Sequence, residues 1–326
     1  MWGDGMKKWI GVLLISCILF LSTGCQTQQT TAIGLVPLDS RPCNTQYAVL
    51  LGEMAGYEVL IPEYGLLDAF TIASDTDALW QWLDKQQCEH YILFTNQLLN
   101  GGLINSRSLT QYQDMDTFFT NLERFIAGHT DSTITILSVL PRLLPSQYDT
   151  ALWQYQKELA TYGGSIDQAL QQNQPLPSRP DGVPEELVDQ YLALYQTNYE
   201  LIQRLMSYTD AHVSLVIGQD DAQQYCPSNI VYRAIGEQAG EHVTLLHGAD
   251  ELTMLTLARY AAEPVALNIV YSDETFTDAY YPYEGADLAS IIAEKAAYAN
   301  ITVDSHAQDT VIIYTDSASL ERTTAL

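Results

Sequence analysis

The sequence predicts an α/β protein in which strand–helix units repeat and build a mainly parallel sheet. Short β-branched apolar runs alternate with amphipathic segments, and glycine often separates a helix from the next strand. Polar residues follow nearly every strand directly. Because all strand ends converge on one site only in a barrel, this distribution favours a TIM-like barrel; a doubly wound open sheet is the alternative.

Each expected strand is an apolar run of strand length bounded by turn residues. The expected strands are 33–38, 57–61, 90–94, 133–140, 213–217, 243–246, 265–271 and 310–314. The expected helices carry apolar residues at helical spacing, and Asp75 is a predicted N-cap. They cover 46–55, 75–87, 116–127, 148–162, 185–208, 228–238, 251–261 and 287–299.

Two connecting stretches are interpreted as loops. Residues 95–107 are polar and contain Gly101-Gly102, which permits tight backbone approach or positive φ, so this stretch is a candidate site loop. Residues 163–184 contain most of the Pro and Gly of the middle of the chain, which predicts a long loop or a lid over the site.

The amino terminus resembles a bacterial lipoprotein signal. Lys7 and Lys8 precede an apolar run at 9–21, which is short for a membrane span, and small residues then lead to Cys25. We therefore expect a signal peptide at 1–24, lipidation of Cys25, a polar tether at 25–32 and a catalytic-like α/β domain at 33–326. This predicts an extracytoplasmic protein anchored to the membrane by its lipid; an ordinary secretory signal is the alternative.

The formal net charge of −26 limits the possible partners. Nucleic-acid binding needs a basic footprint, so no nucleic acid is expected, and adhesion to anionic lipid by charge alone is disfavoured. After the signal, Cys43, Cys88 and Cys226 remain besides Cys25. They lack metal-ligand spacing, and an odd number cannot all pair, so a disulfide scaffold is not indicated.

Two adjacent acid pairs are the candidate catalytic residues. Asp220 and Asp221 follow the expected strand 213–217, and Asp250 and Glu251 follow 243–246. One member of each pair is expected to cap the next helix, which leaves one carboxyl per strand free. Two such acids on neighbouring strands can stand about 5–10 Å apart, the range that glycosidases use. Crowding then raises one pKa and provides an acid and a base.

The remaining polar residues at strand ends are expected to hold a carbohydrate or another small polar substrate. These candidate binding residues are Asp39, Arg41, Asn44, Asn105, Arg107 and Tyr225, with Tyr280, Tyr281 and Tyr283 as candidate stacking residues for sugar rings. No P-loop, GxGxxG or GxSxG motif is present, so no cofactor is expected and serine nucleophile chemistry loses its usual support.

Three functions remain open on these residues. The first is a carboxylate-dependent hydrolase that acts on glycosidic bonds. The second is a non-catalytic lipoprotein that binds saccharide or peptide. The third is a divalent-metal hydrolase, which requires His247 and at least two acids around one point; no zinc-binding motif supports it.

Five motifs in order resemble a bacterial family known as the domain of unknown function 4127 family. They are PLDSRPCN (37–44), NGGLINSR (100–107), SVLPRL (138–143), GQDDA with Tyr225 (218–225) and GADELTMLTLAR (248–259). The resemblance covers 33–326 and implies further residues beyond the carboxyl end. One departure is QQYCPS at 223–228, where the family is typically glycine-rich. The resemblance implies no particular reaction.

Overall fold

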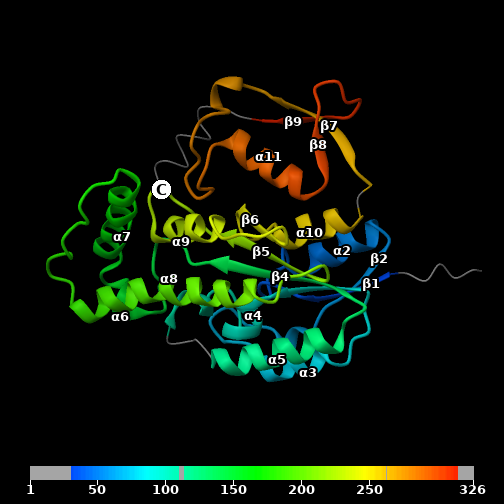
Figure 1. Ribbon diagram of the computed structural model, residues 1–326, viewed down its shortest axis with the longest axis horizontal. Coiled ribbons are helices and arrows are strands. Elements are labelled where there is room, and N and C mark those ends of the chain that lie inside the picture. The colour runs from blue at the N-terminus through cyan, green and yellow to red at the C-terminus, as the bar shows by residue number, and fades with distance from the viewer. Residues whose placement is uncertain (1–30, 110–113, 262, 315–326) are drawn as a thin grey trace, which may run out of the picture. The chain divides into compact units, whose positions relative to one another are not determined.

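The computed structural model describes residues 31–109, 114–261 and 263–314 (Figure 1). The predicted signal peptide and Cys25 lie outside the described residues, so lipidation stays a prediction. The α/β class and the mainly parallel sheet are confirmed. A six-stranded sheet has the order β2-β1-β3-β4-β5-β6, and a second sheet has the order β8-β7-β9.

The larger sheet is parallel wherever its register is defined, from β1–β3 through β5–β6. Its strands are β1 (Thr31–Val36), β2 (Tyr57–Leu60), β3 (His90–Phe94), β4 (Thr133–Leu140), β5 (Val213–Gln219) and β6 (Val243–His247). The central strands β4 and β5 are buried almost throughout. Burial on both faces explains why they read as continuous apolar runs.

The larger sheet does not close, so the favoured barrel is wrong and the doubly wound alternative is correct. Within the described part of the chain, β2 and β6 are its two edges. The chain steps from β1 outward to β2 and returns to β3 on the other side of β1, which makes the carboxyl ends of β1 and β3 a topological switch point. The barrel prediction failed because a polar residue at a strand end can cap local structure: Asp273, for example, accepts a hydrogen bond from the backbone of Thr275.

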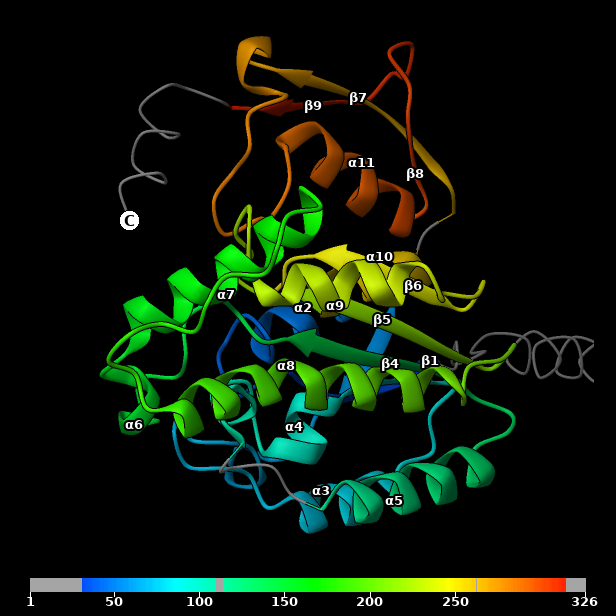
Figure 2. The same cartoon turned by 60° about the vertical axis from the view of Figure 1, so that its left-hand side comes forward.

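Helices cover both faces of this sheet (Figures 1 and 2). They are α2 (Gln46–Met54), α3 (Thr76–Leu83), α4 (Thr95–Asn100), α5 (Met115–Gly128), α6 (Thr150–Trp153), α7 (Gln156–Gln171), α8 (Glu185–Met206), α9 (Pro227–Gly236) and α10 (Leu252–Ala261), with short 3-10 turns at Tyr64–Leu66, Asn105–Arg107 (η2) and Glu274–Phe276. One core cluster joins the sheet to α3, α5 and α8, and the other joins it to α2 and α10.

The second sheet contains β7 (Val265–Tyr271), β8 (Ile301–Val303) and β9 (Thr310–Ile313), with α11 (Leu288–Tyr298) between β7 and β8. β7 was predicted with these bounds, whereas β8 was missed because it has only three residues. Backbone bridges connect Ala222, directly after the first acid pair, with Tyr283 and Glu284. The second sheet's connection therefore lies against the loop that carries Asp220 and Asp221.

Both predicted loops contain more helix than expected. Residues 95–100 form α4, which is fully buried and ends at Gly101 with φ +75°. The predicted helix 148–162 is split into α6 and α7, and α7 continues to Gln171. Gly163 does not break it: a Cβ there would lie 2.8 Å from both Pro227 and the Tyr191 hydroxyl. This glycine lets the helix pack closely, and the loop that remains is correspondingly shorter.

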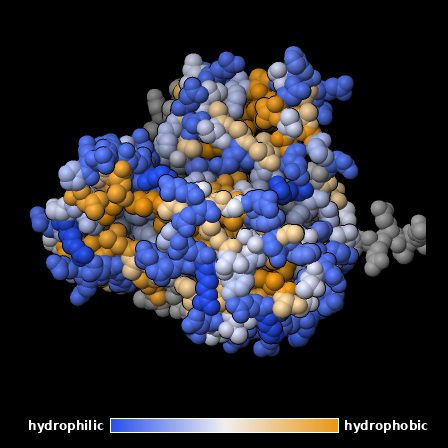
Figure 3. Space-filling model, viewed as in Figure 1, coloured by the Kyte–Doolittle hydropathy of each residue, from blue (hydrophilic) through white to orange (hydrophobic). Residues whose placement is uncertain are grey.

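Hydrophilic side chains dominate the face shown in Figure 3, as expected for a chain with 40 acidic and 14 basic residues. Of the helices in the described ranges, none combines the length and the apolar character that crossing a membrane requires.

Candidate functional site

The turn after β1 is built around the buried carboxylate of Asp39. Asp39 accepts hydrogen bonds from the Arg41 backbone N–H at 3.0 Å, from Arg41 Nε at 2.7 Å and from Asn44 Nδ2 at 2.9 Å. The PLDSRPCN motif therefore encodes a self-contained turn, in which one carboxylate fixes both the backbone and the arginine side chain.

Arg41 connects this turn to the second predicted acid pair. Its two Nη atoms donate to the carboxylate oxygens of Asp250 at 2.9 and 2.5 Å. Burial lowers the pKa of Arg41, but the hydrogen bond to Asp250 and the charges of Asp39 and Asp250 outweigh this and raise it. The bidentate geometry joins the ends of β1 and β6, although Arg41 and Asp250 are both partly exposed.

Asp68 is a buried acid in this cluster that sequence reasoning missed. Its Oδ1 accepts a hydrogen bond from the Ser40 backbone N–H at 2.8 Å. Burial and the charge of Asp39 raise the pKa of Asp68 to about 6. Gly102 permits this arrangement, because a Cβ there would lie 2.9 Å from the Asp68 side chain. No local signal marks Asp68, since it follows no strand.

A second ion pair reaches over the carboxyl end of β4. Arg107, on η2, forms an ion pair with Asp220, which follows β5, and both side chains are largely buried. Burial raises the pKa of Asp220, and the charge of Arg107 opposes that shift. Asn105, on the same short turn, donates to the Gly101 carbonyl at 3.1 Å, so it stabilises the loop that presents Arg107.

Arg142 and Asp221 form the third ion pair, at 3.2 Å. Asp221 has φ +41°, a backbone conformation that few non-glycine residues adopt. The buried tyrosines of α8 hold the arginine's loop: the hydroxyl of Tyr195 donates to the Arg142 carbonyl at 2.7 Å, and that of Tyr191 to the Leu143 carbonyl at 2.8 Å. The loop after β4 is thus held in place by α8.

These groups share one edge of the sheet. β5 and β6 are parallel neighbours, and the Gly248 backbone N–H donates to the Gln219 carbonyl at 3.0 Å. Asp220 directly follows Gln219, and Asp250 lies two residues after Gly248. The structure therefore brings together at the carboxyl edge the residues Asp39, Arg41, Asn44, Asp68, Arg107, Arg142, Asp220, Asp221 and Asp250. We call this set the carboxyl-edge cluster.

Other predicted site residues face elsewhere. Glu251 forms an ion pair with Lys295 on α11. His247 Nδ1 lies 2.9 Å from Glu294 Oε2, and the His247 backbone N–H donates to the other oxygen of that carboxylate. Glu251 and His247 therefore attach α11 to the end of β6. They do not join the acids of the carboxyl-edge cluster.

The predicted tyrosines also have other environments. Tyr225 is half-buried, and its backbone carbonyl lies against Gly164 of α7. The hydroxyl of Tyr280 is buried without a hydrogen-bond partner, and burial raises its pKa. Tyr283 has φ +73° and pairs through its backbone with Ala222. Tyr225 and Tyr283 thus make backbone contacts in or beside the acid-bearing loop.

No metal centre is formed by the described residues: nowhere do three or more His, Cys, Asp or Glu side chains gather so that they could hold an ion. The point required by the metal-hydrolase hypothesis does not form, because His247 faces Glu294 while Asp220 and Asp221 face arginines.

A buried polar network holds the acid-bearing loop from the other side. Asp167, on α7, is fully buried and accepts from the Cys226 N–H at 3.0 Å, from Asn229 Nδ2 at 2.9 Å and from Arg233 at 2.5 Å. Burial raises the pKa of Cys226. Cys226 of the QQYCPS segment is the N-cap of α9, and its backbone N–H joins the start of that helix to Asp167 of α7.

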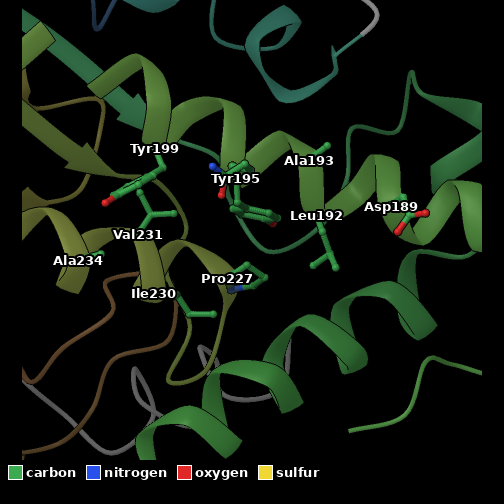
Figure 4. A pocket seen from close by; sticks show the side chains of 10 residues that line it. Asp189, Leu192, Ala193, Tyr195, Tyr199, Pro227, Ile230, Val231 and Ala234 are labelled. Atoms are coloured by element: carbon green, nitrogen blue, oxygen red, sulfur yellow. The ribbon is translucent and has the colours of Figure 1, made fainter. Parts of the chain in front are cut away.

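A hollow of about 410 Å³ lies between α8 and α9 (Figure 4). Leu192, Ala193, Pro227, Ile230 and Val231 supply much of its wall, and Asp189 is its one charged residue. None of the residues of the carboxyl-edge cluster lines this hollow.

The fold and the cluster define a doubly wound α/β protein with a polar, ion-paired site where its parallel strands end. More particularly, the chain belongs to the family described as protein of unknown function (DUF4127), whose model matches residues 33–325. Comparison with curated proteins and with solved structures gave no match.

Proposed function

We propose that the protein is a hydrolase that uses carboxyl groups of the carboxyl-edge cluster to cleave glycosidic bonds. The observation that carries this proposal is that the cluster's acids have unlike environments. Asp68 and Asp220 are buried and their pKa values are raised, whereas Asp221 and Asp250 are more exposed. Acids whose environments differ in this way supply a proton donor and a proton acceptor.

Asp220 is the proposed general acid, because burial raises its pKa against the opposing charge of Arg107 and because it lies beside Asp221. It would donate its proton to the glycosidic oxygen as the bond from the anomeric carbon breaks. Asp221 or Asp250 would accept a proton from the water that adds to that carbon. Arg142 and Arg41 would hold these carboxylates in place. Arg107 would stabilise the carboxylate that Asp220 becomes when it donates its proton, and Asp220 would regain a proton from solvent before the next turnover.

The topological switch point at the carboxyl ends of β1 and β3 supports the same location for the substrate site. In open α/β sheets, ligands bind outside the carboxyl ends of the strands where the strand order reverses, and Asp39, Arg41 and Asp68 gather at the end of β1. These residues, together with Asn44 and Asn105, are the proposed substrate-binding groups. A non-catalytic saccharide-binding protein would use the same groups as hydrogen-bond partners, and it is the alternative outcome of the test.

The test is release of reducing sugar from polysaccharides by the wild type, Asp220→Asn, Asp221→Asn and Asp250→Asn. We expect kcat to fall by about 10²–10⁴ in the Asp220 variant and in one of the other two. Asp84→Asn is the matched control, because Asp84 pairs with Arg124 on the surface away from the cluster. Parent-like rates in all three cluster variants would overturn the proposal, and saturable binding without turnover would favour the binding protein.

We also propose that the protein acts outside the cytoplasm, anchored by a lipid on Cys25. Its support is the basic, apolar and small-residue sequence that precedes Cys25. Membrane fractionation with Cys25→Ser tests it: the wild type is expected in the membrane fraction and the variant is expected to leave it. Equal membrane retention of both would overturn lipid anchoring.

A further inference from the structure

A strained aromatic residue lies beside the cluster and is not used by the proposed chemistry. Ala69 and Ile72 form a small antiparallel bridge, with hydrogen bonds of 2.9 and 3.1 Å between their backbones. Phe70 and Thr71 form its two-residue turn, and Phe70 has φ +60°. Glycine is preferred at the first position of such a turn, and a large side chain there is strained. Strain of this kind is typical of functional sites.

Phe70 is also unusually exposed for an aromatic side chain. It is 58% exposed, and its ring packs edge-to-face on Tyr148 at a centroid distance of 5.4 Å. Tyr148 is itself 46% exposed and comes from the loop after β4. Two loops far apart in the chain thus combine to present a pair of aromatic rings to solvent.

A small polar pocket adjoins this aromatic pair. Its volume is about 50 Å³, and Thr71 and Tyr148 contribute to its wall. The remaining lining residues are Ile104, Asn105, Ser108, Ser146 and Asp149. At roughly 10–15 Å³ for each probe-sized sphere, the pocket holds about four heavy atoms. Its wall offers hydroxyl, amide and carboxylate groups with one aliphatic side chain.

We propose that Phe70, Tyr148 and this pocket form a binding subsite for an N-acetylated amino-sugar unit. The sugar ring packs on the exposed aromatic pair, which apolar C–H faces of sugars favour. The acetamido group has four heavy atoms and enters the pocket, where its N–H faces acceptor oxygens of the wall, its carbonyl faces donors, and its methyl group meets Ile104. An acidic substituent is disfavoured, because Asp149 is part of the wall.

The subsite is connected to the proposed acid through η2. Asn105 and Ser108 flank Arg107 in sequence, and Arg107 pairs with Asp220. A sugar unit on Phe70 would therefore continue toward the carboxyl-edge cluster. This inference names the substrate class of the proposed hydrolase and rests on that function for its catalytic meaning, although sugar binding itself is measured separately.

The experiment is calorimetric titration of the full protein with chitotriose, which is N-acetylated, and with cellotriose, which is not. We expect at least tenfold tighter binding of chitotriose. Phe70→Gly should weaken chitotriose binding at least tenfold and yet raise the unfolding midpoint, because glycine adopts the positive φ without strain. Phe70→Tyr should keep the affinity.

A variant of the pocket wall provides an independent test of the subsite. Thr71 is exposed, so Thr71→Leu should leave the fold intact, narrow the pocket and remove most of the preference for chitotriose over cellotriose. Equal affinity of the wild type for both sugars, or unchanged binding by Phe70→Gly, would overturn the subsite. Chitotriose binding would support the subsite even if the polysaccharide assay showed binding without turnover, which overturns the hydrolase alone, so the two failures remain distinct.

Discussion

Arg107 and Asp220 form a buried ion pair although 113 positions separate them in the chain. Their side chains are only 10% and 11% exposed. Arg107 follows β3 and Asp220 follows β5, so the pair reaches over the end of β4 and ties three neighbouring strands together. A buried ion pair contributes little net stability, but loss of one partner leaves an uncompensated charge in the interior.

Arg107→Met is therefore expected to lower the free energy of unfolding at pH 7 by about 3–5 kcal/mol, measured by urea denaturation. The double variant Arg107→Met/Asp220→Leu should recover much of this loss, because it removes the unpaired charge as well. The surface pair Arg124–Asp84 is the control, and Arg124→Met should cost less than about 1 kcal/mol. If Arg107→Met and Arg124→Met lowered the free energy of unfolding equally, the burial of the Arg107–Asp220 pair would be contradicted.

Much of the fold was predictable because its determinants are local. β3, β4 and β7 have the bounds expected from their apolar runs. The acid pairs 220–221 and 250–251 lie at strand ends as expected, since turn and strand signals adjoin them in the sequence. A local sequence pattern is enough to predict an element whose conformation depends mainly on its own residues.

The contacts of the site were not predictable in the same way. Whether the sheet closes, and which acid meets which arginine, depends on strand order, which no local pattern contains. Asp68 was missed because only the folded chain brings it to Ser40. Gly163 was misinterpreted as a loop residue, because its close partner Pro227 lies far along the chain.

Asp68 gives a pH dependence of unusual sign. Its pKa rises from the ordinary 3.8 to about 6 in the folded protein. Between these values the folded state binds more protons than the unfolded state, so this residue lowers stability as pH rises from about 4 to 6. Asp68→Asn should therefore gain stability relative to the wild type across that range, by about 2–3 kcal/mol, and the gain should stay constant above pH 7.

Urea denaturation of both proteins at several pH values between 4 and 8 measures this difference. Asp75→Asn is a suitable control, since Asp75 is an exposed helix N-cap that retains an acceptor oxygen in the variant. A difference between Asp68→Asn and the wild type that shrinks with rising pH would refute the assigned environment of Asp68.

Glu294 attaches α11 to β6 through both the backbone and the ring of His247. Glu294→Ala removes both acceptors, which should lower local stability by about 1–3 kcal/mol. We expect faster amide hydrogen exchange in α11 and β7, while amides of β4 and β5 keep their protection. Glu241→Ala is the control, because Glu241 lies near β6 but is exposed. Faster exchange throughout the chain would argue against a local attachment.

The three cysteines of the described residues are free and differ in burial. Burial raises the pKa of Cys88 to about 11 and also raises that of Cys226, and both side chains are buried, whereas Cys43 is only partly covered. Because the thiolate is the reactive form, iodoacetamide at pH 8 should modify Cys43 first, and Cys88 and Cys226 only after unfolding.

Peptide mass spectrometry identifies the modified residue and its rate. Burial and the charge of Asp250 raise the pKa of Cys43, while Arg41 lowers it. Asp250→Asn removes the raising charge and frees Arg41, so it should accelerate alkylation of Cys43 several-fold and leave Cys88 unchanged. If Cys88 reacted as fast as Cys43 in the folded protein, the burial that separates them would be wrong. If Asp250→Asn slowed Cys43, the placement of Asp250 beside the turn after β1 would be wrong.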